Sequence, residues 1–162
     1  MEDSIGPWFG FDTRGGRYES VGSSAERVSF TGLGDVGRVV AGLCRLFAAE
    51  GEVPDVVHVA GDTKCVADVA RVMEREGGGP IEVTQAALGE YKERVTSVVG
   101  SDPAAYLRFL MGEGKINQSP AGLGCDNDLV NPEERVWKWK SLEELARETR
   151  GRPWRDLEWP ST

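Results

Sequence analysis

Residues 28–41 read VSFTGLGDVGRVVA, and this stretch carries most of what the sequence says about the fold. Its first part alternates apolar and polar side chains, which predicts a strand. Its second part begins an apolar pattern at helical spacing, which predicts a helix over residues 37–49. Between them, Gly32, Gly34 and Gly37 match the G-x-G-x-x-G spacing of dinucleotide-binding loops. On pattern alone these glycines form a candidate NADP site, because they would let a pyrophosphate approach the helix N-terminus.

The same rules extend the prediction along the chain. Strands are expected at residues 17–21 and 27–31, which would pair as a hairpin, and at residues 56–60 and 80–84. The run at 56–60 is nearly all apolar, which predicts a strand buried on both faces. Further helices are expected from Val66 to Met73, over 88–99, after the Asp102-Pro103 start signal, and after the Ser141–Glu144 capping box. The fold class is therefore α/β (α+β), a few-stranded sheet with several helices, in a single domain over residues 1–162.

Composition limits the function classes. The net charge of −8 argues against nucleic acid as a partner, because phosphate binding requires a basic face. The sequence contains no apolar run of about 18 residues and does not begin with a signal-peptide pattern, so we expect a cytoplasmic protein without a membrane partner. Three cysteines at unrelated spacings predict free thiols, and the single histidine, His58, is expected to be a buried core residue. No metal site is expected.

Six stretches in the same order resemble the NmrA-like (isoflavone-reductase-like) family of atypical short-chain dehydrogenases. They are residues 10–12, 28–41, 54–62, 102–115, 127–132 and 137–141. The resemblance implies that the chain is the C-terminal, substrate-side half of that fold and that the N-terminal dinucleotide-binding half is absent. On this reading the glycine match is coincidental, no cofactor is bound, and Asp35 caps the helix that follows. The family's catalytic lysine lies in the other half, and no Tyr-x-x-x-Lys occurs here, so catalytic residues stay unknown.

A substrate pocket is expected around four aromatic residues. The resemblance places Trp8 and Phe9 near the family's pocket, and Phe30 and Tyr106 complete the candidate set. The alternative for these aromatic side chains is a structural role in the core. Tyr106 could offer a polar group to a ligand, but the polar residues of its helix are explained equally well as a helix cap and surface charges.

Four functions remain open. The first is a truncated NmrA-like protein without NAD(P)-dependent redox activity that binds a small molecule or a protein. The alternatives are an NAD(P)-dependent oxidoreductase that uses Gly32, Gly34 and Gly37, a cofactor-free isomerase or cyclase that reuses the pocket, and a fragment of a longer reductase. If the dinucleotide-binding half is missing, the strand expected at 56–60 becomes an exposed edge. We therefore expect a homodimer or a partner chain.

Overall fold

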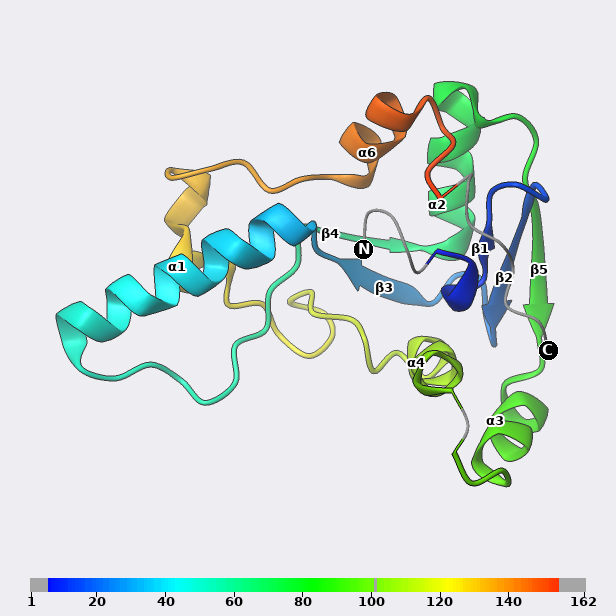
Figure 1. Ribbon diagram of the computed structural model, residues 1–162, viewed down its shortest axis with the longest axis horizontal. Coiled ribbons are helices and arrows are strands. Elements are labelled where there is room, and N and C mark those ends of the chain that lie inside the picture. Colours follow the sequence, from blue (N-terminus) through cyan, green and yellow to red (C-terminus); the bar gives the residue numbers. More distant parts are fainter. Residues whose placement is uncertain (1–5, 101, 155–162) are drawn as a thin grey trace.

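The five strands found in residues 6–100 and 102–154, the part of the chain that the computed structural model describes, form two separate small sheets (Figure 1). One sheet has the order β1 (Phe11–Asp12), β2 (Arg17–Val21), β5 (Glu82–Ala86), with β1 antiparallel and β5 parallel to β2. The other sheet pairs β3 (Arg27–Phe30) with β4 (Asp62–Cys65) in antiparallel orientation. The structure is thus mixed α/β with a few short strands, as the sequence predicts.

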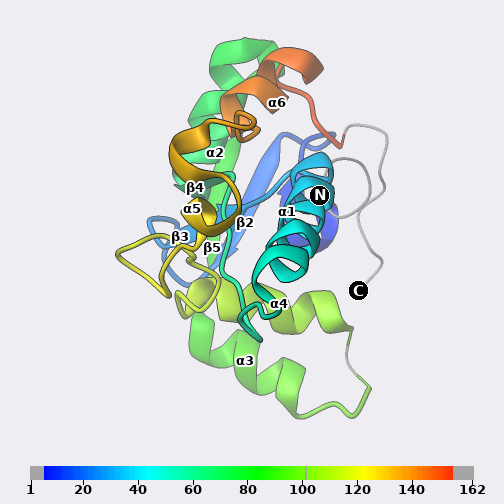
Figure 2. The same ribbon diagram turned by 90° about the vertical axis from the view of Figure 1, so that its left-hand side faces the viewer.

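Helices make up most of the regular secondary structure in the described residues. They are η1 (Pro7–Phe9), α1 (Leu33–Glu50), α2 (Val66–Met73), η2 (Glu74–Gly78), α3 (Leu88–Thr96), α4 (Pro103–Gly112), α5 (Asn127–Val130), η3 (Pro132–Glu134) and α6 (Leu142–Thr149). In Figures 1 and 2, α2 and α6 lie together at one end of the strands and α3 and α4 lie together at the other. Helix α1 extends away from both groups.

Two helix starts follow directly from their capping residues. The Asp102 carboxylate accepts a hydrogen bond from the Ala104 backbone N–H, and Pro103 occupies the first turn of α4. Ser141 and Glu144 form the predicted capping box of α6, in which each side chain accepts from the other residue's backbone N–H.

The main core forms where β1, β2, β3, α2 and α6 meet. Its most deeply buried side chains include Phe11, Tyr18, Val69 and Met73. Helix α4 approaches the other side of β2 so closely that a Cβ at Gly112 would lie 2.0 Å from the Val21 carbonyl oxygen. Only glycine allows that backbone-to-backbone contact.

The predicted hairpin between residues 17–21 and 27–31 is wrong. Both strands form, but they belong to different sheets, because β2 pairs with β1 and β5 instead of β3. The turn between them is bound to other segments of the chain. The Gly22 backbone N–H donates to the Ala86 carbonyl, and the Ser24 carbonyl accepts from the Ala67 N–H. Strand pairing is non-local, so adjacency in sequence did not identify the partner of either strand.

The predicted buried strand at residues 56–60 is also wrong. This segment makes no strand ladder, Val56 is 67% exposed and His58 is half-buried. Its backbone is paired with side chains instead. Asp126 accepts from the His58 N–H, and the Asn127 amide both accepts from the Ala60 N–H and donates to the Ala60 carbonyl. Those contacts satisfy the same groups that a neighbouring strand would, so the exposed sheet edge expected there does not exist.

No helix within residues 6–100 and 102–154 combines the length and the apolar character that a membrane span requires.

Tyr18 gives the fold a pH dependence in the alkaline range. Burial raises the pKa of Tyr18 to about 12 from an ordinary value of 10.0. Between those values the unfolded chain ionises this phenol while the folded chain does not, so stability falls as the pH rises from 10 to 12. The loss is on the order of 1.4 kcal/mol by pH 11. We expect Tyr18→Phe to remove this component when urea unfolding is measured from pH 8 to pH 11. Equal pH slopes for the wild type and the variant would contradict the assignment.

Candidate functional site

An apolar cavity lies between the β3 strand, the N-terminal turn and helix α4. Its volume is about 130 Å³, and its walls are formed by Phe9, Phe11, Val28, Ser29, Phe30, Leu107, Met111 and Ile116. Three of these eight residues are phenylalanines. A cavity of this size and composition resembles the apolar cavities of about 150 Å³ that remain dry and accept a single aromatic ring.

The walls are positioned by buried aromatic contacts. Phe11 is almost fully buried, and its ring lies edge-on to the Tyr18 ring at 5.1 Å and tilted against the Phe30 ring at 6.1 Å. Leu107 and Met111 are four residues apart on α4, so they share one face of that helix. Two rigid elements, a strand end and a helix face, therefore define opposite walls.

Ser29 supplies the only polar side chain on the described wall, and its hydroxyl is already hydrogen-bonded. The Ser29 Oγ lies 2.8 Å from the Thr63 Oγ1 and accepts from the Gln118 backbone N–H at 2.9 Å. The wall residues described above include no Asp, Glu, His, Lys or Cys. The cavity can thus bind an apolar molecule, but its described lining provides no general acid or base.

A smaller hollow of about 30 Å³ adjoins the same strand end. Phe30 borders both spaces, and the second hollow is completed by Thr31, Gly32, Lys140, Ser141, Leu142, Leu145 and Trp154. One of the three glycines of the candidate cofactor motif, Gly32, therefore lies beside an apolar hollow at the start of α6.

The four aromatic residues proposed from the sequence do not form one site. Phe9 and Phe30 both line the larger cavity. Trp8 is 39% exposed and is outside that lining. Tyr106 packs against Phe109 at a ring distance of 5.5 Å, in a separate cluster with Tyr91.

Sequence reasoning missed the remaining wall residues. Leu107 and Met111 belong to α4, which the sequence predicts only as a helix after Asp102-Pro103, and Ile116 lies in the segment that follows it. The i, i+4 spacing of Leu107 and Met111 was the available signal. Nothing in the sequence indicated that these two residues face Phe30, because the contact joins segments about 80 residues apart.

The glycines of the candidate phosphate loop have a different setting from a dinucleotide-binding loop. Gly32 is the N-cap of α1, and Gly34 and Gly37 lie inside the helix. The preceding strand, β3, has a single antiparallel partner among the described residues, whereas a dinucleotide site forms at the edge of a parallel sheet.

Asp35 does not cap α1, contrary to the expectation from the sequence. It lies in the first turn, where its 1% exposed carboxylate accepts from the Lys140 backbone N–H at 2.8 Å and pairs with Arg38 at 2.7 Å. This carboxylate thus fastens the start of α1 to the segment that leads into α6. Its negative charge also occupies the helix end where a phosphate would bind.

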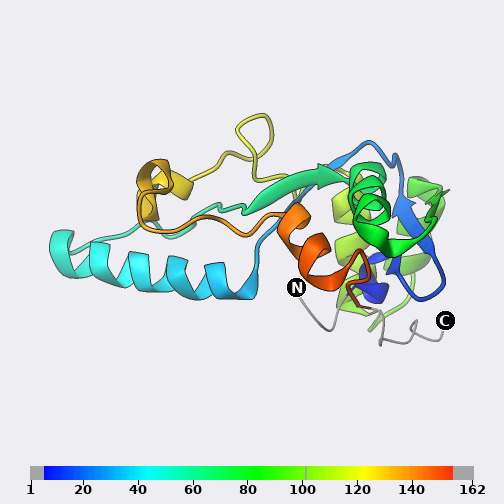
Figure 3. The same cartoon turned by 90° about the horizontal axis from the view of Figure 1, so that it is seen from above.

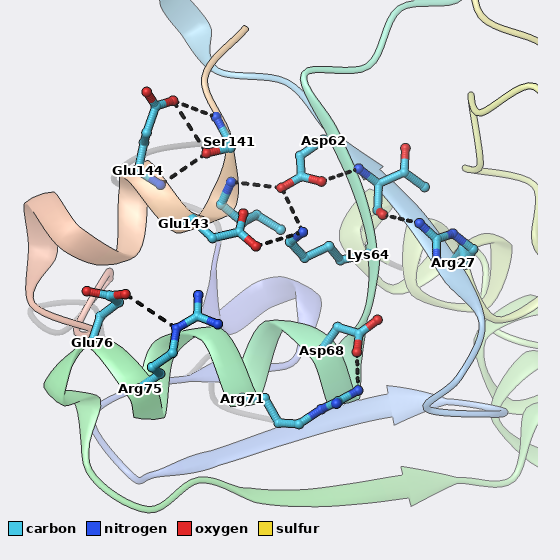
Figure 4. A network of polar contacts seen from close by, with 12 residues as sticks. Arg27, Asp62, Lys64, Asp68, Arg71, Arg75, Glu76, Ser141, Glu143 and Glu144 are labelled. Carbon is cyan, nitrogen blue, oxygen red and sulfur yellow. Dashed lines mark hydrogen bonds and ion pairs between the residues drawn. The ribbon is translucent and has the colours of Figure 1, made fainter.

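A second carboxylate fastens the same segment to β4 (Figure 4). The Asp62 Oδ2 accepts from the Leu142 backbone N–H at 2.9 Å, and Lys64 bridges Asp62 and Glu143. Desolvation of Lys64 opposes its charge, but the two carboxylates outweigh it and raise the pKa of Lys64. Desolvation likewise opposes ionisation of Glu143, and the ion pair with Lys64 lowers the pKa of that carboxyl. The pair therefore stays charged through neutral pH.

The Asp- and Asn-rich loop at residues 126–131 is structural. Asp126 and Asn127 bind the 58–60 backbone as described above, and the buried Asn131 accepts from the Val136 N–H and donates to the Trp137 carbonyl. Within the described part of the chain, no group of three His, Cys, Asp or Glu side chains is arranged to hold a metal ion.

Comparison with known proteins adds no assignment. No family model, no curated protein and no solved structure matches this chain.

The two sides of the Asp35 ion pair are expected to differ in their effect on stability. Asp35→Ala removes the carboxylate that accepts from the Lys140 backbone N–H and should lower the free energy of unfolding by about 1–3 kcal/mol. The matched variant Arg38→Ala breaks the same pair from its exposed side and should cost less than about 1 kcal/mol. Denaturant unfolding at pH 7 measures both values. A loss for Asp35→Ala no larger than that for Arg38→Ala would show that the backbone contact is unimportant.

Proposed function

We propose that this chain is a small-molecule binding module that works without a redox cofactor and takes a single-ring apolar ligand into the Phe9–Phe30 cavity. The observation that carries the proposal is the cavity itself: about 130 Å³, lined by three phenylalanines and four aliphatic or thioether side chains. Burial of an apolar ring against such walls is favourable, and flat aromatic ligands gain further from edge contacts with phenylalanine. Two of the wall residues, Phe9 and Phe30, also belong to the pocket that the sequence analysis predicts.

The wall chemistry supports binding more than catalysis. An isomerase or cyclase needs a group that moves a proton, and the described wall offers one hydroxyl that Thr63 and Gln118 already engage. The resemblance to the substrate-side half of NmrA-like proteins agrees with a pocket that has kept its ligand-binding role.

An NADP-dependent reductase is the second candidate, because Gly32, Gly34 and Gly37 do lie at the N-terminus of an 18-residue helix. Two features count against it. The antiparallel β3–β4 pair supplies no parallel sheet edge, and the buried Asp35 carboxylate lies in the helix turn that would face the phosphates.

Ligand binding can be followed at a methyl group on the cavity wall. We expect toluene or p-cresol to shift the Met111 methyl resonance through the ring current of the bound ligand, with a dissociation constant of about 10⁻⁴–10⁻³ M. The core residue Met73, which is not part of the wall, is the internal control. Leu107→Trp should fill the cavity and abolish the shift, whereas Val99→Trp, at a fully exposed position, should leave it intact. No saturable Met111 shift from a folded sample would refute the proposal.

A separate titration tests whether the chain binds a nicotinamide cofactor. Calorimetry with NADPH and NADP⁺ up to millimolar concentration is expected to give no binding heat, because the Asp35 carboxylate lies in the first turn of α1, where its negative charge opposes a phosphate. The same sample should still bind p-cresol, which shows that it is folded. Micromolar NADPH binding that is lost in Gly34→Val would favour the reductase instead.

A further inference from the structure

Helix α1 carries an apolar face that nothing in the described chain covers. Four bulky side chains remain open to solvent: Leu33 is 69%, Val36 42%, Val40 55% and Phe47 56% exposed. Their spacing of three, four and seven residues places them on one face of the helix. Figure 3 shows α1 along the margin of the molecule, with the other described segments on its opposite side.

A row of small residues runs beside these bulky side chains. It consists of Gly34, Gly37, Ala41, Cys44 and Ala48, at the same alternating spacing of three and four. The glycines at 34 and 37 lower helix propensity, yet a Cβ at either position would meet no atom within 4 Å. Packing against the described residues therefore gives no reason for them, whereas close approach of a second helix does.

The other side of α1 is already used by the fold. Asp35, Val39 and Gly42 are its buried residues, and a Cβ at Gly42 would lie 3.0 Å from the Val130 side chain. Val39 packs with Val130 and Trp139. The bulky and small rows lie opposite this anchored side, so they are free to face a partner.

We propose that α1 is a dimerisation helix, which pairs antiparallel with α1 of a second copy about a two-fold axis near Val40. Four bulky residues and five small ones form a face without a single charge, in a protein of which 28% is charged. In such a pairing Leu33 lies opposite Phe47, Val36 lies opposite Cys44, and Val40 lies opposite its own copy, so apolar side chains meet along the whole contact.

The position of the helix in the molecule favours the antiparallel arrangement. Helix α1 joins the rest of the structure at its N-terminal end, and its C-terminal end points away (Figures 1 and 3). An antiparallel pair places the two molecular bodies at opposite ends of the contact, where they do not collide. The helix dipoles also oppose each other in this arrangement. The same face serves both copies, as a two-fold interface requires.

The area of the face sets the expected strength. The 18-residue helix is about 27 Å long. Its four bulky side chains expose roughly 400 Å² per copy, which is about half of what one partner contributes to a standard interface. The dimer should therefore belong to the weak class and dissociate in the micromolar range.

Sedimentation velocity over a range of concentrations of the whole chain tests the proposal. We expect the average mass to rise from the 17.6 kDa of one chain toward twice that value as the concentration increases. Val40→Glu places two like charges at the symmetry axis and should keep the protein monomeric. Val136→Glu is the matched control, because that valine is 59% exposed, close to the 55% of Val40, but lies outside α1. A wild-type protein that stays monomeric up to several hundred micromolar overturns the proposal.

Two further variants distinguish this contact from other modes of association. Gly37→Leu should raise the melting temperature of the monomer through helix propensity and at the same time weaken the dimer by preventing close approach. Val40→Cys in a Cys44→Ala background should form an intermolecular disulfide on mild oxidation, because position 40 faces itself across the axis. A dimer that survives both Val40→Glu and Gly37→Leu forms through another surface and refutes the proposal. Ligand binding in the cavity should be unaffected by Val40→Glu, so the two proposals can fail separately.

Discussion

The Phe11 side chain makes the contacts that hold the two sheets together. A three-stranded sheet with a two-residue edge and a separate two-stranded sheet are each too small to be stable alone. The Phe11 ring packs on Tyr18 within its own sheet, on Phe30 in the other sheet, and on Trp154 at 5.3 Å near the end of the described chain. The same ring that holds the two sheets together is also a wall of the candidate cavity, so the core and the site share one side chain.

Side-chain acceptors replace missing strands over much of the remaining fold. The segments at residues 58–60 and 137–141, the second of which leads into α6, belong to no strand ladder. Their backbone N–H groups are bound by Asp126, Asn127, Asp35 and Asp62. Because a buried N–H without an acceptor is costly, four short acidic or amide side chains suffice to fix two long irregular segments. This explains how few strands can support so many helices and loops.

The helices could be predicted from the sequence because their signals are local. Asp102-Pro103 and the Ser141–Glu144 box lie within one turn of the helices they begin, and the stripe Val66, Val69, Ala70, Met73 repeats at helical spacing. The predicted strand pairing was wrong because the partner of a strand can lie far away in the sequence. Strand β2 pairs with β5, more than 60 residues later, and residues 56–60 are apolar but join no sheet. For the same reason, two of the four residues predicted for the pocket line the cavity. Phe9 and Phe30 belong to segments that the sequence places near a pocket, whereas Met111 reaches the cavity only through the tertiary packing of α4.

Helix α1 contrasts with the other helices in how little of its length the chain supports. Three glycines, at 34, 37 and 42, lower its intrinsic stability, and most of the stability of a helix in a protein comes from packing of its apolar face. The chain holds it through Asp35 near its start and through Val39 and Gly42 in its middle, whereas the bulky residues Leu33, Val36, Val40 and Phe47 stay largely open to solvent in one copy. Among the described residues, Gly42 alone of the three glycines has a close neighbour, because a Cβ there would lie 3.0 Å from the Val130 side chain. An exposed apolar row, together with two glycines that no described residue crowds, agrees with the proposed contact between two copies of α1, and that contact would also stabilise the outer face of the helix.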